Sequence, residues 1–257
     1  MLGHRLLSRI EQKKARLDEL RPLAVAALAC LQEQILIEWV YNSNAIDGSN
    51  IALNETRLIL ETGLTIGGKS MREHFEVINH RDAIRYVEDL VRSRRLVTPF
   101  EVRQIHKLVF SRIDDGNAGQ YRQSQVRTAG AGTTSPDSWL VPNLVADWAE
   151  WLADEEKTGH PVTLAALAHH RLAAIHPFND GNGRTARLVL NLILMRAGFP
   201  PAIILYAKRR QYYRFLELAD AGKPAALVNF VGRAVESSLN LYLEASIPVD
   251  SPPEAAI

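Results

Sequence analysis

Apolar residues recur at intervals of three or four along almost the whole chain. These positions are Leu6, Ile10 and Leu17; Leu28, Leu31, Ile35 and Trp39; Val77, Ile84, Val87 and Val91; and Ile105, Leu108 and Val109. Side chains with this spacing share one face of an α-helix. The pattern therefore predicts a mainly α fold, in which most of the chain is helical.

Local sequence signals indicate where some of these helices begin. Thr98-Pro99-Phe100-Glu101 places a capping hydroxyl, a first-turn proline and an acid in sequence, which is typical of a helix N-terminus. Pro161 followed by Thr163 indicates another start.

The segment from Gln123 to Pro142 has a different pattern. Val126, Arg127 and Thr128 are followed by a stretch rich in glycine, serine and proline, and then by the apolar run from Trp139 to Val141. Two short runs around turn-forming residues are typical of a β-hairpin. We expect a hairpin attached to the helical body.

Composition narrows the class of protein. Apolar residues make up 47% of the chain and charged residues 23%, with a formal net charge of +1, which favours a globular protein with a buried core. This balance gives no global attraction to nucleic acid or membrane, so any phosphate recognition must be local. Cys30 is the single cysteine, which excludes an internal disulfide, and its apolar surroundings predict a core position.

The N-terminal region contains no segment typical of secretion or membrane insertion. Residues 1–20 alternate charged with apolar side chains, unlike a secretory signal. The apolar run from Pro22 to Leu31 is too short to cross a bilayer. We expect a cytoplasmic protein.

The chemistry is concentrated between His176 and Arg187. Pro177 disfavours helical geometry at His176, so the helix over Leu164 to Ala174 must stop there, and the next helix begins around Gly183. Small residues before a helix let backbone N–H groups converge on an anion. Arginines at positions 184 and 187 can both reach over such a cradle.

Each of these residues also has an ordinary structural interpretation. His176 can take a proton at neutral pH, or it can be a satisfied structural histidine. Asp180 can hold Mg²⁺ beside phosphates, or cap the following helix. Arg184 and Arg187 can bind phosphate, or be solvated helix charges. The combination of all of them within twelve residues favours the catalytic interpretation.

This segment resembles the signature of the Fic family at every defined position: histidine, any residue, phenylalanine, any residue, an acid, Gly-Asn-Gly-Arg, two residues and arginine. The resemblance implies a Fic-like helical bundle with a short β-hairpin flap. It also implies transfer of AMP from ATP to a Tyr, Thr or Ser hydroxyl of a target protein, with self-modification.

By this resemblance, His176 would deprotonate the target hydroxyl and Asp180 would bind Mg²⁺. Arg184 and Arg187 would neutralise the leaving phosphates, and Phe178 would anchor the loop in the core. Tyr212 and Tyr213 resemble tyrosines on the nucleoside side of the pocket, or they pack as half-buried aromatics. The full nucleotide-binding set would be Phe178, Asn179, Asp180, Gly181, Asn182, Gly183, Arg184, Arg187, Tyr212 and Tyr213.

The resemblance extends upstream. Gly119-Gln120-Tyr121-Arg122 resembles the entry to the family's flap, in which Val126, Arg127 and Thr128 would dock the target, and residues 75–80 resemble a helical segment of bacterial members. We expect an N-terminal helical region over residues 1–96, a Fic core over 97–245 and a disordered tail over 246–257.

Ser43-Asn44-Ala45-Ile46-Asp47-Gly48 resembles the family's inhibitory motif, which would start with Ser43 and end with Gly48, with aspartate in place of glutamate. Because aspartate is one methylene shorter, we expect Asp47 to reach Arg187 poorly or through water unless the backbone shifts, and autoinhibition to be weaker than in glutamate-bearing relatives. Asp47 can alternatively be a turn former before Gly48.

Two alternative functions remain open. A Fic-fold enzyme could transfer another phosphate-containing group or remove AMP. A helical regulatory or DNA-binding module without catalysis is disfavoured, because every catalytic position is filled and no basic recognition helix is found. We expect ATP, Mg²⁺ and a target protein as partners, with no nucleic acid and no membrane. The sequence leaves homo-oligomerisation open.

Overall fold

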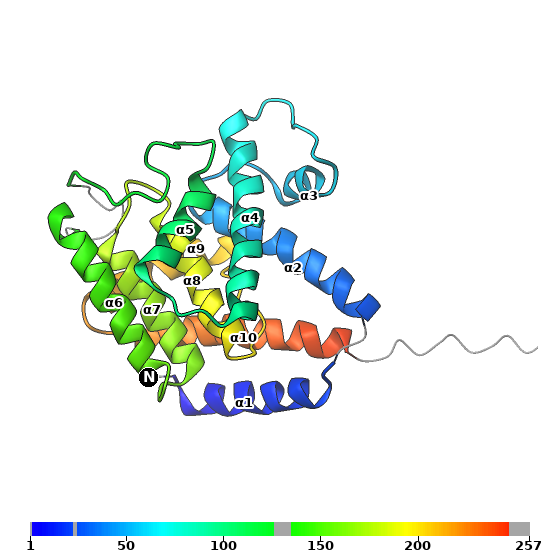
Figure 1. Cartoon of the computed structure of the whole chain (residues 1–257). Helices are drawn as coiled ribbons and strands as arrows, with labels where there is room; N and C mark the ends of the chain where they lie inside the picture. The colour runs from blue at the N-terminus through cyan, green and yellow to red at the C-terminus, as the bar shows by residue number, and fades with distance from the viewer. Residues whose placement is uncertain (1, 23–24, 126–134, 247–257) are drawn as a thin grey trace, which may run out of the picture.

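The computed structural model describes residues 2–22, 25–125 and 135–246, and within these residues the chain is helical with no strand (Figure 1). This confirms the mainly α prediction. The helices are α1 (His4–Glu19), α2 (Val25–Ile46), α3 (Leu53–Thr62), α4 (Met71–Ser93), α5 (Pro99–Phe110), α6 (Val141–Glu155), α7 (Pro161–Ile175), α8 (Asn182–Arg196), α9 (Arg209–Asp220) and α10 (Ala225–Ala245), with short 3-10 helices η1 (Ser138–Leu140) and η2 (Tyr206–Lys208).

The helix starts follow the capping signals in the sequence. At the start of α5, the Thr98 hydroxyl accepts a hydrogen bond from the Phe100 N–H at 3.2 Å, and the Glu101 carboxylate accepts from the Thr98 N–H at 3.1 Å. Ser70 and Glu73 form the same reciprocal pair at the start of α4. Such pairs satisfy backbone donors that the helix leaves free.

The prediction of a second hairpin strand is wrong. Trp139 and Leu140 belong to η1, and Val141 is the first residue of α6. Pro142 explains the difference, because proline in the first turn of a helix removes no intrahelical hydrogen bond and favours helix initiation there. The predicted first strand and flap residues, Val126, Arg127 and Thr128, lie outside the described residues.

Helix α8 lies in the middle of the molecule, with α2, α4, α5 and α7 packed around it (Figure 1). Every side chain from Arg184 to Leu194 is buried. Helices that are covered all round belong to the core of a globular protein. The turn that leads into α8 is therefore anchored to a helix of the core, although Asn179 and Asp180 in it are exposed.

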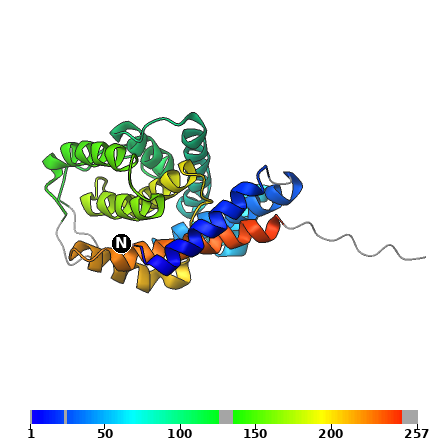
Figure 2. The ribbon, with the colours of Figure 1, turned by 90° about the horizontal axis from the view of Figure 1, so that it is seen from below.

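Helices α1 and α10 run side by side in the same direction along one edge of the molecule (Figure 2). The Gly3 N–H donates to the Asn229 side chain at 2.9 Å, and Arg9 pairs with Glu236 at 2.7 Å. The side chain of Ile10, a residue of α1, is fully buried, and its Cδ1 lies near Gly232 of α10.

Helix α2 corrects the expectation for Cys30, which is exposed. In this part of α2 Leu31 and Ile35 are buried, whereas Ala29 and Cys30 face solvent. An apolar run does not by itself specify which side of a helix is covered.

None of the described helices combines the length and the apolar content that a bilayer crossing requires. Helix α10 ends at Ala245, and residues 247–257 of the predicted tail lie outside the described part of the chain. The division at residues 96 and 97 stays a prediction.

Ile10→Ala is expected to lower the free energy of unfolding by about 2–5 kcal/mol, because it leaves a cavity between α1 and α10. Chemical denaturation of the two proteins measures the difference. Gln12→Ala is the control, since Gln12 is exposed on the same helix. Equal stability of all three proteins would show that α1 is not part of the cooperative core.

Candidate active site

The candidate site indicated by the sequence lies on the turn between α7 and α8. Helix α7 ends at Ile175, and His176 takes a left-handed conformation with φ 52° and ψ 60°. Gly181 is also left-handed, at φ 73°, and Asn182 is the first residue of α8. These boundaries confirm the predicted helix stop at His176 and the helix start around Gly183.

The inner side of the turn is held by aromatic packing. Phe178 is fully buried, and its ring stacks on His106 of α5 with centroids 3.7 Å apart and planes within 2° of parallel. The Gly119 N–H donates to Nδ1 of His106 at 2.9 Å, so Nε2 carries the ring proton and donates to the Asp180 carbonyl at 3.0 Å. Burial lowers the pKa of His106 to about 4, which keeps this ring neutral.

Two further contacts fix the turn. A Cβ on Gly181 would lie 2.3 Å from the Phe110 ring, so only glycine fits this left-handed position. The Asn182 side-chain amide accepts from the Phe178 N–H and donates to the Phe178 carbonyl, both at 2.9 Å. Asn182 therefore braces the turn with its side chain, and the residue also lines the cavity beside it.

An open cavity of about 910 Å³ lies in front of the turn. It brings together most of the residues that the sequence singles out. Its lining includes Asp47, Ala173, His176, Asn179, Asp180, Gly181, Asn182, Gly183, Arg187, Arg209, Arg210, Tyr212, Tyr213, Arg214, Leu216 and Glu217. Phe178 does not line this cavity because its ring faces the core, and Arg184 lines a second cavity of about 370 Å³ with Asp47, Asp180 and Glu76.

His176 is half-buried at the edge of the cavity, where its surroundings lower the pKa of its imidazole below the ordinary value of 6.5. Burial is the main cause, followed by the positive charge of Arg122. The Asp180 carboxylate and a hydrogen bond with the Ala173 backbone act in the opposite direction. The neutral, proton-accepting form of His176 therefore predominates at pH 7.

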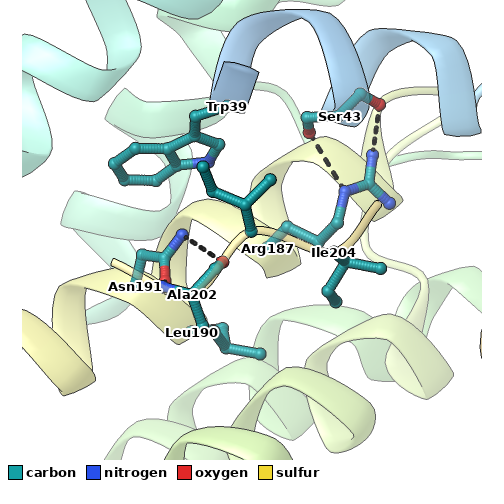
Figure 3. A pocket seen from close by; sticks show the side chains of 8 residues that line it. Trp39, Ser43, Arg187, Leu190, Asn191, Ala202 and Ile204 are labelled. Atoms are coloured by element: carbon teal, nitrogen blue, oxygen red, sulfur yellow. Dashed lines mark hydrogen bonds between the residues drawn. The ribbon is translucent and has the colours of Figure 1, made fainter. Parts of the chain in front are cut away.

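Arg187 joins α8 to the C-terminal end of α2 (Figure 3). Its Nε donates to the Ser43 hydroxyl at 3.0 Å, and its Nη2 donates to the Ser43 carbonyl at 2.8 Å. Nη2 also lies 3.0 Å from the Asp47 carboxylate. Burial opposes the charge, but the Asp47 carboxylate raises the pKa of Arg187 above its usual value, so the guanidinium stays charged.

The expectation that Asp47 reaches Arg187 poorly is wrong. Helix α2 ends at Ile46, so Asp47 lies in the turn before Gly48, which has φ 105°, and this turn brings the shorter side chain close enough. The carboxylate oxygens of Asp47 also lie 3.1 and 3.4 Å from the point where a Cβ on Gly183 would stand. Asp47 therefore covers the first turn of α8 as well as pairing with Arg187.

Arg184 and Arg187 are not solvated helix charges, because their residues are only 3% and 4% exposed. Nε of Arg184 lies 3.5 Å from Asp47, and Nη1 lies 3.6 Å from Glu76 of α4. Two buried guanidiniums at a helix N-terminus form a strongly positive site, which the carboxylates of Asp47 and Glu76 balance.

The Asp180 side chain is largely exposed at the mouth of the cavity. Its Oδ1 accepts from the Gly181 N–H at 2.6 Å, and its Oδ2 pairs with Arg72 at 3.3 Å. The helix-capping interpretation is not observed, since α8 has no side-chain cap. No group of three His, Cys, Asp or Glu residues suited to a metal occurs in the described part of the chain. A cation at Asp180 would thus depend on phosphate oxygens and water for its other ligands, which is a usual arrangement for Mg²⁺.

The two tyrosines of α9, Tyr212 and Tyr213, also line the cavity. Tyr212 is buried, its hydroxyl lies 2.7 Å from Nε2 of His169, and burial raises its pKa to about 12. Tyr213 is half-buried, with the exposed guanidinium of Arg209 5.3 Å from its ring centroid. Arg209 and its neighbour Arg210 are exposed and also border the cavity.

Sequence reasoning missed His106 and the contacts of Arg122. The available signal for His106 was a histidine inside the apolar face of a helix, beside Ile105 and Val109. Arg122 belongs to the segment Gly119–Arg122 that the sequence indicates. Its hydrogen bond to the His176 carbonyl, at 2.7 Å, joins residues 54 positions apart, so no local sequence signal predicts it.

Comparisons with known proteins show the family to which the chain belongs. The model of the Fic/DOC family matches residues 96–194. The protein adenylyltransferase Fic of Drosophila mojavensis is 36% identical over 247 residues, which are 96% of this chain and 49% of that protein. The Nematostella vectensis protein of the same name is 36% identical over 244 residues, or 94% of this chain and 56% of that protein. The chain thus spans about half the length of the curated relatives it matches.

Solved structures show the same fold. C. elegans Fic-1 (residues 134–508) is 36% identical with a TM-score of 0.84, over 93% of this chain and 72% of that one. A Fic-domain signaling protein from Bacteroides thetaiotaomicron is 26% identical with a TM-score of 0.85, over 93% and 97% of the two chains. The 36% identity with C. elegans Fic-1, over 72% of that chain, shows that this chain belongs to the Fic/DOC family.

Proposed function

We propose that this chain is a protein adenylyltransferase that transfers AMP from ATP to a Tyr, Thr or Ser hydroxyl of a target protein. It also transfers AMP to hydroxyl groups of its own chain. The observation that carries the proposal is that a neutral histidine, the N-terminus of α8 and the buried Arg187 border one cavity. The cavity is large enough for a nucleotide. The name shared by the curated relatives supports the same reaction.

In this reaction the target oxygen forms a bond to the α-phosphorus of ATP, and the bond from that phosphorus to the bridging oxygen breaks. Pyrophosphate leaves with the bonding electrons. His176 takes the proton of the attacking hydroxyl, so the hydroxyl develops negative charge only as it attacks. The first N–H groups of α8 and the two arginines stabilise the negative charge of the phosphates.

Asp180 would hold Mg²⁺ at the cavity mouth, where the ion would neutralise charge on the phosphates. Arg72 now pairs with that carboxylate across an exposed, 3.3 Å contact. Exposed pairs of this kind are weak, so a divalent cation can displace the arginine at little cost.

Asp47 acts as a brake in this proposal. It occupies the space beside Gly183 and bonds to Arg187, the group that would otherwise receive the terminal phosphates. ATP must displace a carboxylate from a buried arginine, and two anions cannot share that guanidinium without repulsion. A carboxylate in this place could also orient water, which keeps AMP removal as the alternative activity.

Replacing the base tests the reaction. His176→Ala is expected to lower the rate of AMP incorporation, measured by mass spectrometry after incubation with ATP and Mg²⁺, by about 10²- to 10⁴-fold. ATP affinity by calorimetry should change less than about 2-fold, because His176 makes no phosphate contact in this scheme. His4→Ala, on the exposed side of α1, is the control. A phosphate adduct, or no adduct with the native protein, would contradict the proposal.

The pH profile tests the state of the base. Since the pKa of His176 is lowered, activity should fall as pH drops through a midpoint below 6.5, and should approach a plateau above that midpoint as pH rises to 7.5. Measuring the initial rate of self-modification between pH 5 and 8 gives this midpoint. A midpoint above 7 would mean that the charged imidazole is favoured in the folded protein, contrary to the burial seen here.

Removing the Asp47 carboxylate tests the brake. Asp47→Ala is expected to raise ATP affinity and self-modification roughly 10-fold, because Arg187 becomes available to the phosphates. Asp47→Asn keeps the shape and should have a smaller effect of the same sign. Asp154→Ala, at an exposed aspartate, is the control. Equal ATP affinity and equal rates in all four proteins would show that Asp47 does not inhibit the reaction.

A further inference from the structure

Arg122 is a buried charged residue whose guanidinium binds backbone carbonyl groups. It is only 2% exposed. Nε donates to the His176 carbonyl at 2.7 Å, Nη1 to the Ser124 carbonyl at 3.2 Å and Nη2 to the Pro136 carbonyl at 2.5 Å. Burial lowers the pKa of Arg122, a cost that these hydrogen bonds offset.

Two of these carbonyls stand on either side of residues 126–134. Ser124 precedes that segment and Pro136 follows it, so one guanidinium contacts described residues on both sides of it. Two more bonds join the same ends: the Gln125 side chain donates to the Ser135 carbonyl at 2.8 Å, and the Ser138 hydroxyl donates to the Gln123 carbonyl at 2.9 Å.

The third carbonyl belongs to the catalytic turn. His176 has a left-handed backbone, which L-residues adopt only when their surroundings hold them there. The bond from Arg122 to its carbonyl, together with the bond from the Arg122 N–H to the Pro177 carbonyl at 3.0 Å, fixes the two peptide groups after Cα of His176. The direction of the imidazole depends on this backbone.

We propose that Arg122 is a positioning residue for His176, and that it ties the geometry of the chain on both sides of residues 126–134 to the placement of the base. This inference rests on the proposed function. Three carbonyls in three separate segments require the branched, planar donors of arginine, since an ammonium group on one stem cannot reach all of them.

The charge of Arg122 adds a second, measurable effect on the base. The charge of Arg122 lowers the pKa of His176, whereas the charge of Asp180 raises it. The charged groups that border the same cavity are Asp47, Arg187, Arg209, Arg210, Arg214 and Glu217. Removing the positive charge at residue 122 should favour the protonated imidazole.

The test compares Arg122→Lys with the native residue in the full chain, both with Asp47→Ala to raise the signal. AMP incorporation is followed by mass spectrometry over a range of ATP concentrations with Mg²⁺. The maximal rate should fall about 10- to 100-fold, because a small misplacement of the base is costly. The ATP concentration at half-maximal rate should change less than about 2-fold, because the phosphate groups are held elsewhere.

Arg122→Met distinguishes the effect of the charge at residue 122 from its effect on the position of His176, because methionine removes the charge that lysine keeps. It should lose at least as much rate as Arg122→Lys, and the acid limb of its pH profile should lie at higher pH, whereas that of Arg122→Lys should not move. Arg171→Lys on α7, whose guanidinium lies over Trp151 at the surface, is the matched control and should behave as the native protein.

Unchanged rates in Arg122→Lys, or equal losses in rate and ATP affinity, would overturn the inference. If Arg122→Lys does not fold, Gln125→Ala and Ser138→Ala decide, since each removes one bond between the ends of the segment without touching the core. Lower maximal rates with unchanged ATP dependence support the coupling, and native rates in both overturn it. Absence of AMP transfer in the Arg122-containing parent would refute the proposed function instead.

Discussion

The turn between α7 and α8 is held in place by side chains that belong to neither helix. Two of its residues, His176 and Gly181, have left-handed backbones, and for a residue with a side chain this costs roughly 1–2 kcal/mol. The stacking of Phe178 on His106 and the bonds from Arg122 stabilise the turn from two directions. The distance between the base and the start of α8 is therefore fixed before any ligand arrives.

Electrostatics in this site depends on local pairing, because the chain as a whole is nearly neutral. Arg184 and Arg187 are buried with Asp47 and Glu76 as their counter-charges. An isolated guanidinium there would carry a large desolvation cost. The positive charge that attracts phosphates must therefore be balanced by a carboxylate when no phosphate is present. Asp47, just beyond the end of α2, carries that carboxylate.

The features that the sequence predicted are those with local causes. The capping box at Thr98, the helix stop before Pro177 and the glycine turn each depend on neighbours within a few residues. The apolar run at Trp139 was misread because the signal that decides it, Pro142 at the start of α6, follows the run. Asp47 was judged by the length of its side chain, although the position of its backbone, just beyond the end of α2, decides its reach.

The contacts that the sequence could not predict are also those that set the chemistry of His176. This residue follows the last turn of α7, and the C-terminus of a helix favours a cation, so the location alone would raise the pKa of the imidazole. Burial and the charge of Arg122 act against this and produce a lowered pKa. A base placed in this way is neutral at rest, while the carbonyls of α7 and the Asp180 carboxylate stabilise the imidazolium once a proton arrives. The opposing influences come from a helix that the sequence predicts and from an arginine 54 residues away, so they are seen together only in the folded chain.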